Sequence, residues 1–265
     1  MPFIPVNDPK DLRLAAYREV RERDLVGRQG RFVAEGEVVL RHLLGPKSRF
    51  EAESVLIAAN RRAALDDVLS CAACPVYVAE QPVMDAVAGF AIHRGILAIG
   101  RMGEPTSAQA ILADPETRDL VLAIVGVGNH DNMGGLFRAA AAFGVRAVVM
   151  DSTCCDPLYR KAIRVSVGAS LITPFARLAT GEDVAAVLGQ YGYAPLALTP
   201  SATERLDEVR VTGPAAVIVG AEGPGLPEAT MAKCRRIGIP MAGGFDSLNV
   251  ATAAAITLHH LAVER

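Results

Sequence analysis

The 265-residue sequence has few aromatic residues and no long run of apolar ones. It contains no Trp, and aromatic residues make up 5% of the chain, so stacking on nucleic-acid bases would be a minor mode of recognition. No charge-free apolar stretch approaches the roughly 20 residues that a membrane helix needs. The opening segment, "MPFIPVNDPK", lacks the basic-then-apolar order of a secretory signal. These absences predict a cytoplasmic protein with no membrane partner.

Cysteine is also scarce, and its spacing does not indicate a metal site. There are five cysteines, an odd number, and only "CAAC" (Cys71–Cys74) has the spacing of half a zinc knuckle or of a thiol redox pair. No second pair and no nearby His stands at metal-ligand spacing, and the motif leads into a predicted strand rather than opening a helix. We therefore expect a structural role for these cysteines and no bound metal.

Two common catalytic motifs are missing, and a third is incomplete. The sequence has no G-x-x-x-x-G-K-[ST] and no G-x-S-x-G, which excludes P-loop enzymes and hydrolases with a nucleophile elbow. The "GVG" at Gly126–Gly128, with Asp151 closing the next apolar run, imitates a dinucleotide fingerprint. Asp131 occupies the place of the third glycine and would set a carboxylate against a pyrophosphate. A Rossmann-type nucleotide-dependent oxidoreductase is therefore a weak alternative.

Net charge is small, but positive charge is concentrated in two segments. The formal net charge is −2. Residues 10–49 hold ten Lys or Arg against six Asp or Glu, and residues 138–177 hold six against two. Local positive surfaces matter more than the total when the partner is a polyanion. The alternative for each segment is a solvated helix face of mixed charge.

The first hundred residues mix helical and strand patterns. Amphipathic periodicity predicts helices over residues 11–26 and 35–44, and short apolar runs predict strands over residues 54–60, 74–80 and 95–102. The stretch from Gly100 to Asp119 has a linker composition, with Gly, Pro, Ser and Thr. We accordingly expect a small α/β domain over residues 1–103, a linker over 104–118 and a second domain over 119–265.

The second domain shows regular alternation of strands and helices. Apolar runs at 120–127, 145–150, 194–199, 215–220 and 237–241 alternate with helical stretches such as 181–192 and 247–264. This order predicts an α/β domain with a parallel sheet that is covered on both faces. Ligands of such sheets bind beyond the carboxyl ends of the strands, so the residues that follow each strand are the candidates for function.

Three of these strand exits carry candidate chemistry. In "GNHDNMGGLFRAAAAFG", Arg138 is a lone cation in a stretch that becomes helical in composition after Gly134; the alternative is a surface side chain that only extends into water. "GAEGPGLP" places Glu222 in a glycine-rich turn. In "IPMAGGFDSLN", Ser247 and Asn249 are candidates for holding a ligand. The alternative role for Ser247 is to cap the next helix, and capping explains Asn249, which lies inside the turn, less well.

The three stretches together resemble the SpoU/TrmH family of RNA 2'-O-ribose methyltransferases. The family's ordered motifs match "N-x-G-x-x-x-R" (Asn132 to Arg138), "G-x-E-G-x-G-L" (Gly220 to Leu226) and "I-P-M…S-L-N-V" (Ile239 to Val250). The N-terminal "RFVAEG" and "HRGILAIG" are similar to the small RNA-binding domain of many members. One departure is that Asn129-His130 stands where the family usually has Asp-Pro before the first motif.

The resemblance implies a fold, a cofactor and partners. The expected fold is an α/β domain with a trefoil knot, which general rules of chain topology would have argued against. The expected cofactor is S-adenosylmethionine, and the expected assembly is a homodimer acting on structured ribosomal or transfer RNA. By the resemblance, the residues that line the cofactor pocket are Leu198, Thr199, Gly220, Ile239, Met241 and Leu248. RNA contacts are expected from Arg31, His93 and Arg94.

The resemblance also makes Arg138 the residue that activates the ribose 2'-hydroxyl. A guanidinium group is a poor base because its pKa exceeds about 12. Two roles remain: a base whose pKa is lowered by a phosphate-bound environment, or a fork that grips the adjacent phosphate and stabilises the developing alkoxide. The second is favoured. Asn132, Glu222, Ser247 and Asn249 would position Arg138 and the target nucleotide. The alternative is a knotted RNA-binding protein without turnover.

Overall fold

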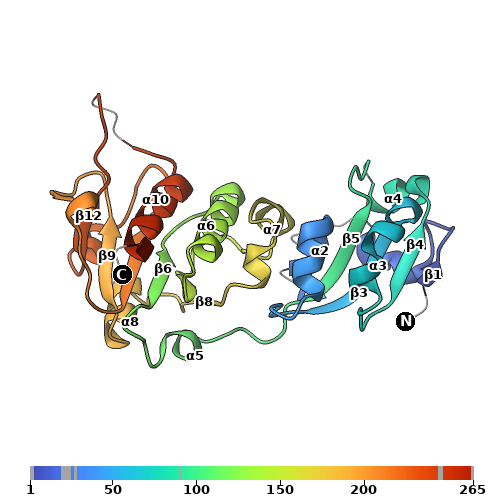
Figure 1. The fold of residues 1–265 in the computed structure, drawn as a ribbon, viewed down its shortest axis with the longest axis horizontal. Coiled ribbons are helices and arrows are strands. Elements are labelled where there is room, and N and C mark those ends of the chain that lie inside the picture. The colour runs from blue at the N-terminus through green and yellow to red at the C-terminus, as the bar shows by residue number, and fades with distance from the viewer. Residues whose placement is uncertain (1–2, 19–24, 27–28, 90, 244–246, 264–265) are drawn as a thin grey trace. The chain divides into compact units, whose positions relative to one another are not determined.

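The computed structural model describes residues 3–18, 25–26, 29–89, 91–243 and 247–263. The chain forms two compact units (Figure 1). The first contains Met1–Glu104 together with Leu158–Ile172, and the second contains Pro105–Pro157 together with Thr173–Arg265. Among the described residues, no helix has both the length and the apolar character to cross a membrane.

The first unit is built on a mixed sheet with strand order β1-β4-β3-β5-β2. β1, β4 and β3 run parallel, and β5 pairs antiparallel with both β3 and β2. The strands are β1 (Phe3–Pro5), β2 (Arg31–Glu35), β3 (Glu51–Ala58), β4 (Val76–Ala79) and β5 (Ile96–Arg101). The helices are η1 (Leu12–Tyr17), α2 (Glu37–Leu44), η2 (Ala59–Arg61), η3 (Ala63–Leu65), α3 (Asp66–Leu69), α4 (Gln81–Ala88), α7 (Arg160–Val165) and η4 (Ala169–Leu171).

Most of the expected elements of the first unit are confirmed. α2 and strands β4 and β5 form within the predicted ranges, β3 overlaps its range but begins three residues earlier, and the short strands β1 and β2 were not predicted. The expected amphipathic α-helix over residues 11–26 is wrong in its first part, because Leu12–Tyr17 is a 3-10 helix that buries Leu14 and Tyr17. Residues 19–24 of that range lie outside the described residues.

The segment around α7 belongs to the first unit, although it lies far along the chain in the range expected for the second domain. Ala162 and Ile163 of α7 are buried, and the helix packs against β2. Gly168 follows with a φ of +82°, and a Cβ there would lie 3.3 Å from the Cα of Val39 on α2. A glycine at this position therefore lets the segment lie close to α2.

The second unit holds a sheet of parallel strands with order β10-β12-β9-β11-β6-β7-β8. All of its strand pairs are parallel. The strands are β6 (Leu120–Ile124), β7 (Ala147–Met150), β8 (Phe175–Arg177), β9 (Ala194–Leu198), β10 (Glu204–Arg205), β11 (Ala215–Val219) and β12 (Arg235–Gly238). The helices are α5 (Ala108–Leu112), α6 (His130–Ala142), α8 (Val184–Gln190), η5 (Leu206–Glu208), α9 (Glu228–Met231) and α10 (Val250–Val263). The predicted parallel-sheet α/β architecture is confirmed.

Part of the expected linker belongs to the core of the second unit. Residues 108–112 form α5, whose start is capped by the Ser107 side chain accepting a hydrogen bond from the N–H of Ala110. Ile111 and Leu112 are buried in a cluster with Val121 of β6 and Leu188 of α8. The expectation of a linker over 104–118 is therefore wrong for residues 108–112. The Gly and Pro residues around them gave the whole range a linker composition.

Candidate functional site

The residues expected to bind a cofactor follow three neighbouring strands. β12, β9 and β11 lie side by side in the sheet, and their carboxyl ends lead to Ile239 and Met241, to Thr199, and to Gly220 respectively. The side chains of Leu198, Ile239 and Met241 are half-buried, and Leu248 is 39% exposed. The carboxyl edge of the sheet thus presents a set of partly exposed apolar groups that come from separate segments.

Gly220 is required by the shape of the turn that follows β11. A Cβ at Gly220 would lie 2.4 Å from the carbonyl carbon of Gly225, a distance that no side chain tolerates. The N–H of Gly225 donates to the carbonyl of Ala221 at 3.1 Å, and Gly223 and Gly225 both have positive φ. The turn folds back on itself and holds Glu222, which is exposed, at its tip.

Helix α6 carries both Asn132 and Arg138 and begins earlier than the sequence predicts. It starts at His130, because the side chain of Asn129 accepts a hydrogen bond from the N–H of Asp131 and caps the helix. Gly134 and Gly135 therefore lie within α6, where a helix was expected only after Gly134. A Cβ on Gly135 would lie 2.7 Å from the Cβ of Ala251, so the glycine allows α6 and α10 to approach closely.

Asn249 connects the three strand exits. Its Nδ2 donates to Oδ1 of Asn132 at 2.8 Å and to Oε1 of Glu222 at 3.2 Å. Its Oδ1 accepts from the N–H groups of Ala251 and Thr252 at 3.0 and 3.3 Å, and its carbonyl accepts the N–H of Ala253. Asn249 is therefore the N-cap of α10, and the expectation that capping explains this residue poorly is wrong.

Arg138, another expected catalytic residue, is not bonded to this network within the described residues. Arg138 is exposed, and within the described part of the chain it has no hydrogen-bond or ion-pair partner. It lies six residues after Asn132 on α6, about 9 Å further along the helix axis. Ser247 is also exposed, two residues before Asn249. Arg138 thus presents an unpaired guanidinium group on the same helix as Asn132, about 9 Å along the axis from the bonded set of amide and carboxylate groups.

Asp151, which is not among the expected site residues, has a structural role in the loops at this edge of the sheet. At the end of β7, its carboxylate accepts hydrogen bonds from the N–H of Gly126 at 3.2 Å and from the N–H and hydroxyl of Thr153. Burial alone raises its pKa, but the hydrogen bonds from Cys154, Gly126 and Thr153 outweigh burial and lower the pKa overall. Asp151 joins the loops that follow β6 and β7. Its sequence signal is an Asp followed two residues later by Thr at a strand end.

The expected RNA-binding residues lie in the first unit, and they differ in their partners. Arg31 on β2 forms a two-pronged ion pair with Glu53, with distances of 2.6 and 2.9 Å. His93 and Arg94, just before β5, are exposed and have no such partner among the described residues.

The cysteines do not form a metal site in the described part of the chain. Cys71 is exposed and Cys74 is buried, and both are free thiols. Burial raises the pKa of Cys74 and brings the pKa of Cys154 to about 12, so both thiols stay protonated at neutral pH. No group of three or more His, Cys, Asp or Glu side chains is placed to hold a metal ion within the described ranges.

Comparison with known proteins places this architecture in a family. Residues 119–259, more than half of the chain, match the SpoU rRNA Methylase family. The chain is also 40% identical over 269 residues to an uncharacterized tRNA/rRNA methyltransferase of Mycobacterium tuberculosis, an alignment that covers 96% of this chain and 90% of that protein. The chain belongs to the SpoU rRNA methylase family. The resemblance seen in the sequence is thereby confirmed, and the Rossmann-type oxidoreductase alternative is wrong.

The chain is also similar to a further curated protein and to solved structures. The 23S rRNA (guanosine-2'-O-)-methyltransferase RlmB of Vibrio parahaemolyticus is 32% identical over 186 residues, which cover 69% of this chain and 75% of that protein. A crystal structure of an RNA 2'-O ribose methyltransferase matches with a TM-score of 0.80 and 26% identity over 99% of both chains. An AdoMet-bound rRNA methyltransferase from Sinorhizobium meliloti shares the fold, with a TM-score of 0.82, 20% identity and coverage of 98% and 97%.

Proposed function

We propose that this SpoU family member transfers the methyl group of S-adenosylmethionine to a ribose 2'-hydroxyl of a structured ribosomal or transfer RNA. The observation that carries the proposal is the bonding of Asn249 to both Asn132 and Glu222. Of these residues, Asn132 lies on α6, the helix that also carries the unpaired Arg138. The printed names of the relatives support the same reaction, since one is a guanosine-2'-O-methyltransferase of 23S rRNA and one solved structure is an RNA 2'-O ribose methyltransferase.

The carboxyl edge of β9, β11 and β12 fits the methyl donor. The partly exposed side chains of Leu198, Ile239, Met241 and Leu248 offer the apolar surface that an adenine ring and a thioether need. Gly220 and Thr199 bring main-chain groups to the same edge without a bulky side chain at Gly220. When bound, S-adenosylmethionine supplies a methyl group activated by its attachment to a positively charged sulfur.

The residues of this chain would orient the ribose while its 2'-hydroxyl group loses a proton. The 2'-oxygen forms a bond to the methyl carbon while the carbon–sulfur bond breaks, and the hydroxyl proton leaves to solvent or to a nearby acceptor. A fixed network is suited to such an in-line displacement, because correct placement of the reactants supplies much of the rate. We assign Asn132, Glu222 and Asn249 to this placement and Ser247 to contact with the same nucleotide.

Arg138 acts as a clamp in this proposal. An exposed guanidinium group with no partner among the described residues is free to take a two-pronged hold on the phosphate next to the target ribose. From there its charge stabilises the alkoxide that develops as the hydroxyl proton leaves.

The test is methyl transfer from labelled S-adenosylmethionine to unmodified total RNA, with the product nucleosides identified by mass spectrometry. We expect a 2'-O-methyl nucleoside from the wild-type protein. Arg138→Ala should lose about 100-fold to 1000-fold in rate. Arg138→Lys, which keeps the positive charge but not the two-pronged geometry, should retain part of the wild-type rate. Binding of the methyl donor without transfer to any RNA pool would instead favour an RNA-binding protein without turnover.

We also propose that the protein is a homodimer through α10. Helix α10 exposes two large apolar side chains, Ile256 at 41% and Val263 at 68%, on a helix whose other side is buried in the second unit. Exposed apolar stripes of this kind are typical of protein–protein contacts. Light scattering should give twice the mass of the chain, and Ile256→Glu should give the monomer. A monomeric wild-type protein would refute this proposal.

The trefoil knot is a further proposal that follows from family membership. β11 lies between β6 and β9 in the sheet, although it comes after both in the chain, so the chain must return to the middle of a sheet whose neighbours are already placed. Single molecules stretched from both ends should stop short of the length of an unknotted 265-residue chain. Extension to the full length would contradict a knot.

A further inference from the structure

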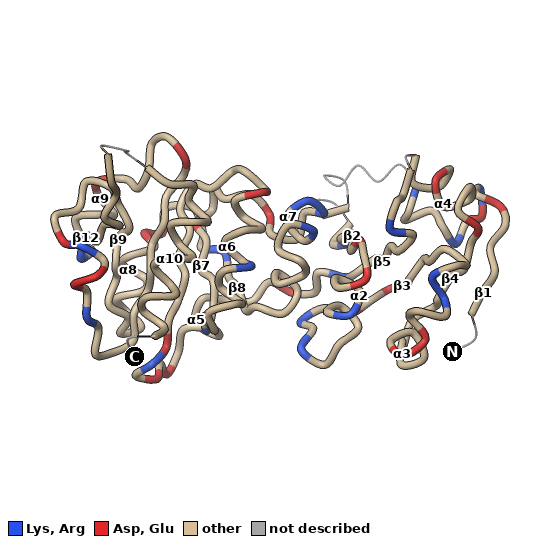
Figure 2. The backbone as a smooth tube through the Cα atoms, turned by 45° about the horizontal axis from the view of Figure 1, so that its top comes forward, with Lys and Arg blue, Asp and Glu red and all other residues tan. Residues whose placement is uncertain are grey.

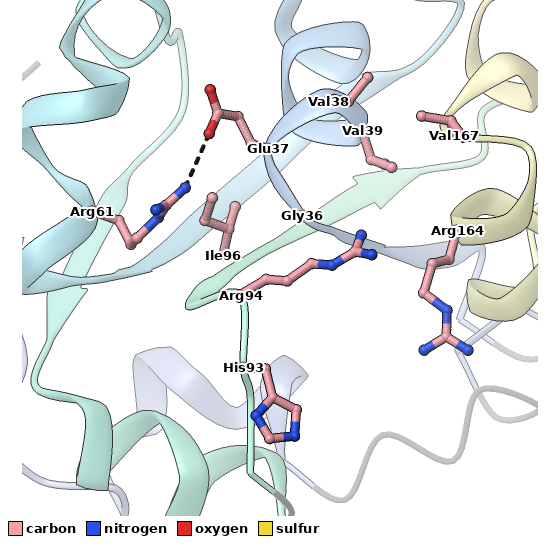
Figure 3. Close-up of a pocket in the computed structure, with 10 residues that line it drawn as sticks. All are labelled: Gly36, Glu37, Val38, Val39, Arg61, His93, Arg94, Ile96, Arg164 and Val167. Atoms are coloured by element: carbon pink, nitrogen blue, oxygen red, sulfur yellow. Dashed lines mark hydrogen bonds and ion pairs between the residues drawn. The ribbon is translucent and has the colours of Figure 1, made fainter.

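The first unit contains a cavity of about 520 Å³ that is lined mainly by basic and aliphatic groups (Figure 3). Three segments contribute to it: the start of α2, the turn before β5, and α7 with the residue after it. The lining residues include four that carry or can carry positive charge, Arg61, His93, Arg94 and Arg164, and one carboxylate, Glu37. Cavities with such a lining recognise anions.

The cations of this cavity differ in how they are engaged. The carboxylate of Glu37 is held by Arg61 at 3.0 Å and by Arg41 at 3.1 Å, so its charge is already compensated. Within the described residues, Arg94 and Arg164 have no hydrogen-bond or ion-pair partner. Their guanidinium groups turn into the same open space (Figure 3). Two free guanidinium groups facing one space repel each other unless an anion lies between them.

The start of α2 adds unsatisfied donors to the same cavity. Gly36 is the N-cap, with a φ of +98° and no side chain to cap the helix. No described residue accepts a hydrogen bond from the N–H groups of Glu37, Val38 or Val39. In addition, Nε of Arg61 is buried and has no hydrogen-bond partner in the described part of the chain. The helix dipole and these free N–H groups favour a negative group at this position.

Gly36 also makes room for the arginine that crosses it. A Cβ at position 36 would lie 3.0 Å from Nη1 and 3.2 Å from Cδ of Arg94. The positive φ favours glycine at this position, and a Cβ would push the Arg94 side chain aside. The motifs "RFVAEG" and "HRGILAIG" therefore meet in one structure, since the first ends at Gly36 and the second begins at His93.

We propose that this cavity binds a phosphate group of the RNA backbone, held by Arg94, Arg164 and the N–H groups at the start of α2. This proposal rests on the proposed function, because it takes RNA as the substrate. A phosphodiester fits better than a stacked base, since among the described lining residues the only ring is that of His93 and the apolar ones are Val38, Val39, Ile96 and Val167. Arg164 belongs to α7, a helix rich in basic residues (Figure 2), so the site is complete only when α7 packs into the first unit.

The experiment measures the affinity for two unmodified transcripts, a domain of 23S ribosomal RNA and a transfer RNA, over a range of salt concentrations. Arg94→Gln and Arg164→Gln should each weaken binding about threefold to tenfold, and each should reduce the slope of log affinity against log salt by about one unit or less. Arg13→Gln is the matched control, because Arg13 is an exposed cation of the same unit that is already paired with Asp11; it should leave affinity and slope nearly unchanged.

A variant that is expected to tighten RNA binding sharpens the test. Glu37→Gln removes the one carboxylate found among the described lining residues and frees Arg61, so we expect RNA binding about two to three times tighter and a steeper salt dependence. All four variants should unfold cooperatively and keep the wild-type affinity for S-adenosylmethionine, which shows that they are folded; Glu37→Gln should have a slightly lower unfolding midpoint because its ion pairs with Arg41 and Arg61 are lost. Unchanged RNA affinity and salt slope in Arg94→Gln and Arg164→Gln would overturn the inference.

The outcome can be separated from that of the proposed function. If the wild-type protein methylates RNA while the cavity variants bind RNA as tightly as it does, the reaction stands and the phosphate site is wrong. If no RNA is methylated but RNA binding depends on Arg94 and Arg164, the phosphate site stands and the proposed reaction is wrong.

Discussion

The polar groups at the sheet edge of the second unit and those in the cavity of the first unit are held in different ways. Asn249 is bonded to Asn132 and Glu222 within 3.2 Å, whereas Arg94 and Arg164 of the cavity have no partner among the described residues. A reaction needs groups fixed in one geometry, and a polyanion needs accessible charge. Changes at the sheet edge should therefore reduce the rate, and changes in the cavity should alter affinity and its dependence on salt.

After Arg138, the largest effect is expected from Asn249, which both caps α10 and bonds the other site residues. Asn249→Ala should lose about 100-fold in methyl transfer and about 1 kcal/mol of unfolding free energy, because the cap is lost. Asn249→Asp keeps the oxygen that caps α10 but loses the N–H donor to Asn132 and Glu222. It should therefore lose a similar factor in rate, and urea unfolding should show some loss of stability because the new carboxylate lies against that of Glu222. Full activity in Asn249→Asp would show that the network does not position the substrate.

Next in size is the effect of filling the contact between α6 and α10. Gly135→Ala would bring two Cβ atoms to 2.7 Å and should cost about 1 to 3 kcal/mol of unfolding free energy. Gly189 lies in α8 with no atom within 4 Å of an added Cβ, so Gly189→Ala should stabilise the protein by up to about 1 kcal/mol. Denaturant unfolding measures both. Equal values for the two variants would contradict the close packing of α6 against α10.

The smallest effect is expected from Arg31, which the resemblance assigns to RNA binding. Its guanidinium group is already paired with Glu53, so RNA must displace a carboxylate to reach it. Arg31→Gln should change the affinity for the ribosomal RNA transcript by less than about twofold, against the larger change expected for Arg94→Gln. A loss as large as that of Arg94→Gln would mean that the pair opens when RNA binds.

The sequence predicts those elements whose pattern is local. β6 and β11 are continuous apolar strands, and α8 has clear helical periodicity, so all three were expected near their true bounds. The motif residues Asn132, Glu222 and Asn249 were expected together from the family resemblance. Their hydrogen bonds, and the role of Asn249 as the N-cap, depend on segments that are 27 and 117 residues apart, which periodicity cannot show.

What the sequence does not predict depends on distant contacts. β8 and β10 are strands of three and two residues, too short for a pattern of alternation. The Arg31–Glu53 pair follows from the register of β2 and β3 on either side of β5, and no local rule gives that register. The packing of α7 into the first unit depends on a contact between segments more than a hundred residues apart, so composition placed α7 in the second domain.

The division of the chain has a consequence for its synthesis. Ala162 and Ile163 are part of the buried interior of the first unit, yet they follow four elements of the second unit in the chain, namely α5, β6, α6 and β7. Domains often fold in order as they leave the ribosome. Here the first unit is not complete until residue 172 has emerged, so the N-terminal sheet must wait, with the α7 side of β2 uncovered, while a good part of the second unit is being made.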